Sequence, residues 1–557
     1  MVILSLLEKR PEIIALYQGK TSHLEYCPRI GKITPPGARP KAKRGFFAIL
    51  QRTMNSTLEK SLPVTAEANI KSILEWLALA HGHHGPEYID QLLRQLLLLR
   101  ETPVPNSQRT KLLDLLYAQA ERIVCAELPL LHEVSLPISR RLRLRVRLIL
   151  ELLEMLTQDY FNTLSELFDP LSSAPSRSPQ TSLRRVMHCI AWQIKVNHLV
   201  AAPSCLGLWQ QLHAAYGTAR RLGLANSPET SSTQSIERIY LSILLAAIAQ
   251  PASFCSAELE FIAQYIDQID KLPTLSDTPP EDSESVFWID LDKDIPAHAL
   301  IRRSPGAETQ ALYFSCRAIA EHALAQRKEL NKGRTTAELG IPAFAENHAG
   351  RGVLLRLHHL WGQPAKRRFP RRRQSYRANL CSGLAQLWLL SKAPASAIEH
   401  SEWMVTNESP EGYALMHIAG DTENLRVGDI IALQSQDEAS DNNQAWRICI
   451  IRWAISENPE HVELGLQLLA SSAIAAEIFL PKTPDAGKIA ALMLPETPPL
   501  RPYPALVVPT DTLKENSESI IVLIENANLE IRQVRTTHID EQTSSIEVFS
   551  VLPDDSQ

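Results

Sequence analysis

Basic residues dominate one short segment in the middle of the chain, Lys366–Arg377, where they occupy seven of twelve positions. Arginine suits guanine and phosphate together, because its planar guanidinium donates paired hydrogen bonds to guanine and also stacks on the base. Pro370 disfavours a helix just before the last arginines. On an extended segment Arg373 and Arg377 point the same way, since side chains alternate with a period of two. Such a segment can clamp an anionic ligand, although a basic run alone is more typical of a solvated segment or of nonspecific attraction to nucleic acid.

A second polar element, Asn407–Gly412, follows further along the chain and reads Asn-Glu-Ser-Pro-Glu-Gly. Asn407 offers an amide and Ser409 a hydroxyl, both able to donate and accept hydrogen bonds. Being two residues apart, they lie on one face of an extended strand. Pro410 and Gly412 favour a tight turn in which a ligand can approach the backbone closely. We expect this element to complete the arginine site.

Taken together, RRxxxR (Arg372 to Arg377) and NxSxxG (Asn407 to Gly412) resemble the signature of PilZ domains, the bacterial receptors for cyclic di-GMP. Other parts of the pattern follow in order. Arg426–Ile431 fits the turn before a strand, Arg452-Trp453 fits the end of the next strand, and Leu464–Leu468 fits the last strand, with Leu where Phe is usual. The resemblance covers residues 367 to 470.

The resemblance implies a small antiparallel β-barrel that binds cyclic di-GMP, with no cofactor or metal besides this ligand. Residues carried over as ligand-binding are Arg372, Arg373, Arg377, Asn407, Ser409 and Gly412. Trp453 is expected near the site. The sequence departs from the family pattern at Glu408 and Glu411, whose acidic charge inside the motif is expected to weaken anion binding.

Two alternatives of different classes remain open. In the first, the PilZ fold binds no nucleotide and serves only as a scaffold for protein interaction. In the second, the arginine-rich arm binds RNA or DNA, in which case affinity falls steeply with salt. The chain as a whole has no excess of positive charge to attract nucleic acid, because its net charge is −5 and its pI is near 6.4.

Composition indicates a soluble, multidomain protein. The chain has 557 residues, 45% hydrophobic and 21% charged, a length that suggests about three domains. Its eight cysteines are scattered without paired spacing, which is typical of reduced thiols in a cytoplasmic protein rather than of zinc or disulfide frameworks. No nucleophile, P-loop or metalloprotease motif is present, so we expect no enzyme.

The expected architecture is α+β, with an all-helical N-terminal region followed by β structure. Helical periodicity recurs through residues 1–272, which form a bundle or solenoid expected to bind a protein partner. An α/β connecting segment is predicted at 285–340, a PilZ-like barrel with its basic arm at 345–480, and a β extension or second small barrel at 495–557. Within these regions, Leu354–Leu360 and Leu380–Leu390 are predicted as strands and Ser471–Ile478 as a helix.

Three other segments invite a functional interpretation. His81–His84 and His358-His359 lack further ligands at metal-binding spacing, so polar surface is favoured over a metal site. Arg140–Arg147 alternates arginine with aliphatic residues, which fits side chains lying over a bundle surface better than an RNA or lipid contact. Ile239–Ala257 is uncharged but interrupted near its end by Gln250 and Pro251, which favours a buried helix over a membrane span.

Overall fold

The computed structural model describes most of the chain from residue 64 onward. The described residues are 64–79, 85–132, 134–166, 179–227, 234–281, 284–306, 308–364, 369–392, 399–422, 425–436, 445–458, 461–480, 487–498, 501–513, 517, 520–525 and 529–554. Residues 1–63 of the predicted helical region, His81–His84 and the start of the basic arm at Lys366–Arg368 lie outside them.

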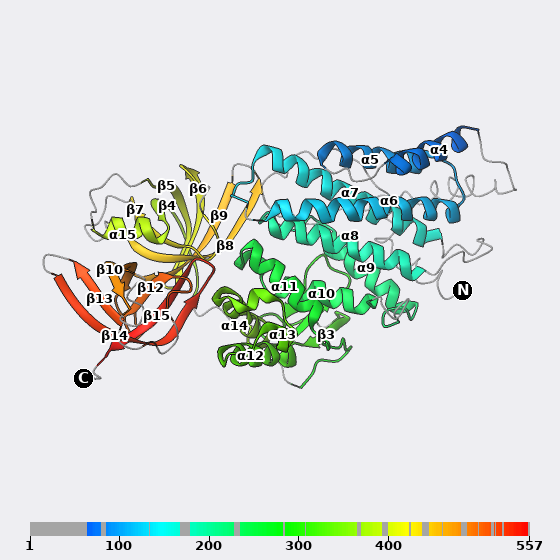
Figure 1. The fold of residues 1–557 in the computed structure, drawn as a ribbon. Coiled ribbons are helices and arrows are strands. Elements are labelled where there is room, and N and C mark those ends of the chain that lie inside the picture. Colours follow the sequence, from blue (N-terminus) through cyan, green and yellow to red (C-terminus); the bar gives the residue numbers. More distant parts are fainter. Residues whose placement is uncertain are drawn as a thin grey trace, which may run out of the picture.

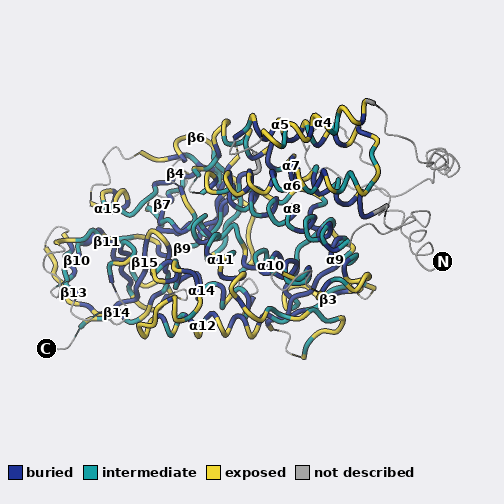
Figure 2. The backbone as a smooth tube through the Cα atoms, turned by 45° about the vertical axis from the view of Figure 1, so that its right-hand side comes forward, coloured by how far each residue is buried: buried dark blue, intermediate teal, exposed yellow. Residues whose placement is uncertain are grey.

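The first part of the structure is a layered array of helices, as the periodicity predicts (Figure 1). Its helices are α4 (Val64–Leu79), α5 (Pro86–Glu101), α6 (Asn106–Glu127), α7 (Arg140–Glu166), α8 (Pro179–Leu199), α9 (Leu208–Arg221), α10 (Ile236–Ile248) and α11 (Ser256–Gln268), with short 3₁₀ turns η1 (Leu128–Leu131) and η2 (Pro251–Ser253). The uncharged segment from Ile239 lies in α10, which is buried among its neighbours (Figure 2). No helix in the described ranges is long and apolar enough to cross a membrane.

A small sheet and further helices connect the helical array to the barrels. The sheet has the order β2-β1-β3, formed by β1 (Val286–Asp290), β2 (His298–Ala299) and β3 (Ala311–Ser315). It is followed by α12 (Arg317–Asn331), α13 (Thr336–Leu339), η3 (Ala343–Glu346) and α14 (His348–Gly362).

The predicted strand Leu354–Leu360 is wrong, because these residues lie inside α14. Leu354, Leu357 and Trp361 are buried on one side of this helix and join the core of the helical array. Their spacing places them on a single helical face. The Trp361 indole also donates a hydrogen bond of 3.2 Å to the Leu245 carbonyl of α10. The local sequence pattern of Leu354–Leu360 predicts a strand, but packing against the neighbouring helices makes the segment helical.

The first barrel closes in the order β4-β5-β6-β9-β8-β7. Its strands are β4 (Arg372–Ser382), β5 (Ser401–Ser409), β6 (Gly412–Ala419), β7 (Ile430–Ser435), β8 (Arg447–Asn458) and β9 (His461–Ala470). The prediction of one strand over Leu380–Leu390 is wrong beyond Ser382, because α15 (Leu384–Lys392) follows. Gly383 makes this change of direction at φ +90, a conformation that favours glycine.

A second closed barrel follows after three residues, in the order β10-β11-β12-β15-β14-β13. Its strands are β10 (Ile474–Phe479), β11 (Ile489–Leu494), β12 (Ala505–Pro509), β13 (Ile520–Glu525), β14 (Leu529–Gln542) and β15 (Ile546–Pro553). The helix predicted at Ser471–Ile478 is wrong, since β10 pairs there with β11 and β13. The first barrel therefore ends at residue 470 and the second begins at residue 474, well before the β extension expected at 495–557.

The two barrels lie side by side at one end of the helical array (Figure 1). The long hairpin β8–β9 of the first barrel reaches the helices, where the Ser456 amide donates to the Ala201 carbonyl at 2.8 Å. Thr422 of the same barrel donates to the Leu136 carbonyl at 2.5 Å. In the second barrel, Glu547 contacts His348 at the start of α14, with 2.6 Å between Oε1 and Nδ1. The helices thus contact both barrels.

Candidate functional site

The three arginines of the predicted clamp all lie on β4, the strand that leads from α14 into the first barrel. Arg372, Arg373 and Arg377 are exposed. Arg377 forms an ion pair with Glu402 of β5, with 2.7 Å between Nη1 and Oε1. Neither the Arg372 side chain nor the Arg373 side chain makes a hydrogen bond or ion pair to another described residue. Two guanidinium groups are therefore available and one is held by a carboxylate.

Arg373 lies directly opposite Asn407 in the β4–β5 pairing. Asn407 is in turn opposite Ala414 of β6, whose neighbour Leu415 is fully buried in the barrel interior. Because side chains alternate along a strand and cross-strand partners share a face, Ala414, Asn407 and Arg373 lie on the outer face. Arg377 lies on the same face, four residues along β4, as the spacing predicts.

The same cross-strand row continues over β9 and β8. Ala414 lies opposite Gly465, and Gly465 lies opposite Trp453. A Cβ on Gly465 would fall 1.8 Å from Trp453 Nε1, so the indole lies directly over this glycine. The row therefore reads arginine, asparagine, alanine, glycine, tryptophan. The small residues Ala414 and Gly465 form a buried floor in the middle of the row, and the Trp453 indole covers the floor at Gly465.

Ser409 and Gly412 form the turn between β5 and β6 rather than the floor. The Ser409 hydroxyl donates to the Gly412 carbonyl at 3.3 Å. A Cβ on Gly412 would lie 1.9 Å from the Leu466 carbonyl oxygen of β9. The close approach that Gly412 permits is thus made by the neighbouring strand. In this structure both residues hold the turn in place.

Glu408, expected to weaken anion binding, sits opposite Arg372 and is surrounded by donors. The Tyr376 hydroxyl donates to its carboxylate at 3.3 Å, and Arg447 of β8 approaches at 3.6 Å. The guanidinium carbon of Arg447 also lies 5.7 Å from the centre of the Tyr413 ring. The Arg447 guanidinium donates a hydrogen bond of 2.5 Å to the Tyr413 hydroxyl. The acidic charge of Glu408 is therefore balanced in part by Arg447 within the barrel.

Burial raises the pKa of the two tyrosine hydroxyls near Glu408, those of Tyr413 and Tyr376. Desolvation raises the pKa of Tyr413 to about 12, even though the nearby Arg447 guanidinium opposes the rise. Desolvation and the Glu408 carboxylate also raise the pKa of Tyr376. Both phenols therefore stay protonated near neutral pH, and Tyr376 keeps the proton that it donates to Glu408. Sequence reasoning gave Arg447 no role and matched Gly465 only as part of the last strand, because the register of distant strands brings both to the site.

Other segments singled out in the sequence are occupied by structural contacts. His358 Nδ1 lies 3.0 Å from the Ala320 carbonyl inside the helical array. On α7, Arg145 pairs with the buried Glu127 at 3.0 Å, and Arg143 donates to the Ile138 carbonyl at 3.0 Å. Among the described residues, no group of three His, Cys, Asp or Glu is placed to hold a metal ion.

Comparison with known families gives two matches. Residues 71–281 match the model described as "Cyclic-di-GMP receptor FimW, N-terminal domain", and residues 389–474 match "Cyclic-di-GMP receptor FimW, middle PilZ domain". Together they cover more than half of the chain. The chain belongs to the PilZ-domain cyclic di-GMP receptor family. The family's helical N-terminal domain and PilZ domain therefore account for the helical array and the first barrel.

The PilZ match includes Asn407–Gly412 and Trp453 but begins after the arginines of β4. The assignment of Arg372, Arg373 and Arg377 thus rests on their motif and on their place beside Asn407. No curated protein matches the chain.

Proposed function

We propose that this chain binds cyclic di-GMP on the outer face of its first barrel. The observation that carries the proposal is the cross-strand pair of Arg373 and Asn407, which places a guanidinium and an amide beside the small floor of Ala414 and Gly465. Arginine recognises guanine edges and phosphates and can stack on a base. Trp453 at the end of the row offers a surface on which a base can stack.

Each motif residue has a distinct part in the proposal. Arg373 and Arg377 bind guanine and phosphate. Arg372 lies on the other face of β4, opposite Glu408, and supplies a further contact from the exposed start of the strand. Asn407 completes the polar edge of the site, while Ser409 and Gly412 fix the turn that positions it. The ligand needs no metal or cofactor in this arrangement, and no enzymatic step is proposed.

Binding is proposed to change how the barrels sit on the helices. The arginines lie at the start of β4, and the segment before them leads directly from α14, which packs in the helical array. A ligand that holds this connection against the barrel favours one arrangement over another, provided that it binds the two with different affinity. We propose that the helical array binds a protein partner in the cytoplasm and that this rearrangement exposes or covers its surface. Small-angle scattering profiles that are identical with and without ligand would contradict the coupling.

Calorimetric titration of cyclic di-GMP tests the site itself. Saturable binding is expected for the wild type and is expected to be lost in Arg373→Ala and Arg377→Ala. Arg535→Ala is the matched control, because it removes an exposed arginine from the second barrel. Absence of any binding by the wild type would favour a scaffold that ignores the nucleotide. Salt-sensitive binding shared by unrelated nucleic acids would favour the nucleic-acid alternative.

A further inference from the structure

The two barrels have the same strand order. When the strands of each barrel are numbered from one to six along the chain, both close in the order 1-2-3-6-5-4, with every pairing antiparallel. The two copies follow each other directly, with Ser471–Ala473 between them. The family match stops at residue 474, so the second barrel is left without an assigned role. This repetition allows each position of the first barrel to be compared with its counterpart in the second.

The counterpart of the ligand row in the second barrel is apolar. Across β10, β11, β12, β15 and β14, successive cross-strand partners read Ala475, Leu492, Val507, Val548 and Glu541. The first four are at most 4% exposed. No arginine or asparagine stands on this row. Small or branched apolar side chains therefore replace the groups that would recognise guanine.

This apolar row is covered by the first barrel. Leu492, Val507 and Val548 belong to one buried cluster with Ile430 of β7 and Ile450 of β8. At the end of the row, Glu541 forms an ion pair with Arg452 of β8, next to the tryptophan of the ligand row. The face that carries the proposed nucleotide site in one barrel thus carries a protein contact in the other.

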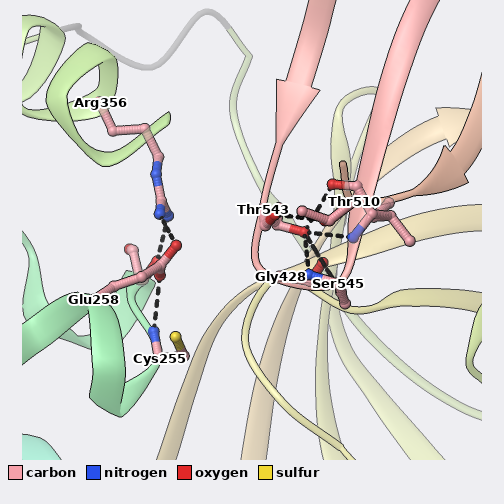
Figure 3. Close-up of polar contacts among 9 residues, drawn as sticks. Cys255, Glu258, Arg356, Gly428, Thr510, Thr543 and Ser545 are labelled. Atoms are coloured by element: carbon pink, nitrogen blue, oxygen red, sulfur yellow. Dashed lines mark hydrogen bonds and ion pairs between the residues drawn. The ribbon is translucent and has the colours of Figure 1, made fainter. Parts of the chain in front are cut away.

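Hydrogen bonds fix the same contact at its edge. The carbonyl oxygen of Gly428, in the turn before β7, accepts from the Thr543 hydroxyl at 3.0 Å and the Ser545 hydroxyl at 3.2 Å (Figure 3). Gly428 has φ +94, and a Cβ there would lie 3.1 Å from Thr543 Cβ. A larger residue at 428 would strain the turn and crowd this junction.

The linker and the β11–β12 loop of the second barrel also lack side chains placed to bind the nucleotide. Its linker is Ser-Ser-Ala, and its connection from β11 to β12 is a longer loop closed from within by Arg501. This arginine is 6% exposed and donates to the carbonyls of Pro495, at 2.6 Å, and Tyr503, at 2.9 Å. Its donors are turned inward to the loop backbone.

We infer that the second barrel is a duplicated PilZ-type barrel whose nucleotide-binding face has become a docking face for the first barrel. The chain then has one class of cyclic di-GMP site, and the two barrels behave as one unit. The statement about ligand sites rests on the proposed function, whereas the statement about docking does not.

The docking face is tested with Val548→Ala in the full chain, measured by hydrogen exchange and thermal unfolding. Loss of two methyl groups from the shared cluster is expected to reduce amide protection across the contact, in β7 and β8 as well as in β15. Ile531→Ala is the matched control, because Ile531 lies on the outside of β14 and is 64% exposed. Loss of protection confined to the second barrel would overturn the docking role.

The ligand statement is tested by titrating cyclic di-GMP into a chain that carries both Arg373→Ala and Arg377→Ala. No saturable binding is expected to remain. Residual saturable binding would place a second site elsewhere and overturn the inference that the second barrel ignores the ligand. If the wild type itself binds no cyclic di-GMP, the proposed function fails, and the exchange experiment still decides the docking role.

Discussion

The ion pair between Arg377 and Glu402 leads to a counterintuitive prediction: removing this acidic residue tightens ligand binding. In the ligand-free structure Glu402 Oε1 lies 2.7 Å from Arg377 Nη1. If Arg377 turns to guanine or phosphate, the ion pair must break. The Glu402→Gln change removes the competing charge while keeping the side chain's size. Arg377 then has no ion pair with residue 402 to break before it binds the ligand.

The expected gain follows from the exposure of the pair. The Arg377 side chain is 60% exposed and Glu402 26%, so solvent screens their attraction. Exposed ion pairs of this kind contribute about 0.2–1 kcal/mol. Since about 1.4 kcal/mol corresponds to tenfold in affinity, Glu402→Gln is expected to lower the Kd for cyclic di-GMP by up to about fivefold.

Calorimetry on three proteins decides the question. Besides the wild type and Glu402→Gln, Glu463→Gln serves as a control, because it removes the same charge from an exposed position on β9. The control corrects for the change in net charge of the barrel. Weaker binding by Glu402→Gln alone would refute the reasoning, because it would mean that Glu402 positions Arg377 for the ligand rather than competing with it.

Two further predictions concern stability. Gly412→Ala is expected to destabilise the first barrel by about 1–3 kcal/mol, because its Cβ would press on the Leu466 carbonyl; thermal unfolding checks this against Gly217→Ala, where the added Cβ meets open space. The second concerns His348, whose pKa is raised by its hydrogen bond to the Glu547 carboxylate. Stability from this contact is full below the ordinary pKa of 6.5 and is lost as pH rises through the higher folded value. Unfolding midpoints measured from about pH 6 to about pH 8 should therefore fall less in His348→Gln than in the wild type.

The sequence predicts those parts of the site that depend on local chemistry. Extended arginines after Pro370 and a turn at Ser409–Gly412 follow from backbone preferences, and both lie where expected. The floor of Ala414 and Gly465 depends instead on the register between β6 and β9, whose residues are far apart in the chain. The family pattern includes Gly465 within Leu464–Leu468, but no local pattern reports that this glycine pairs with Ala414.

The errors in the fold share a cause. The run from Leu354 to Leu360 is apolar enough to read as a buried strand, yet distant helices select α14. Ser471–Ile478 is rich in alanine and reads as a helix, yet pairing with β11 and β13 makes its second half a strand. In both cases tertiary contacts override a weak local preference, as they commonly do for short apolar segments.

The motif divides into residues already committed to the fold and residues still available to a ligand. Ser409 and Gly412 serve the turn, so a variant at either position that loses binding does not by itself locate the ligand. The Arg373 and Asn407 side chains make no hydrogen bond to another described residue, so their loss removes recognition with little effect on packing. Binding and stability should therefore separate at Arg373 and Asn407 and fall together at Gly412. That contrast, more than the loss of binding at any one position, distinguishes a nucleotide receptor from a barrel kept only for its shape.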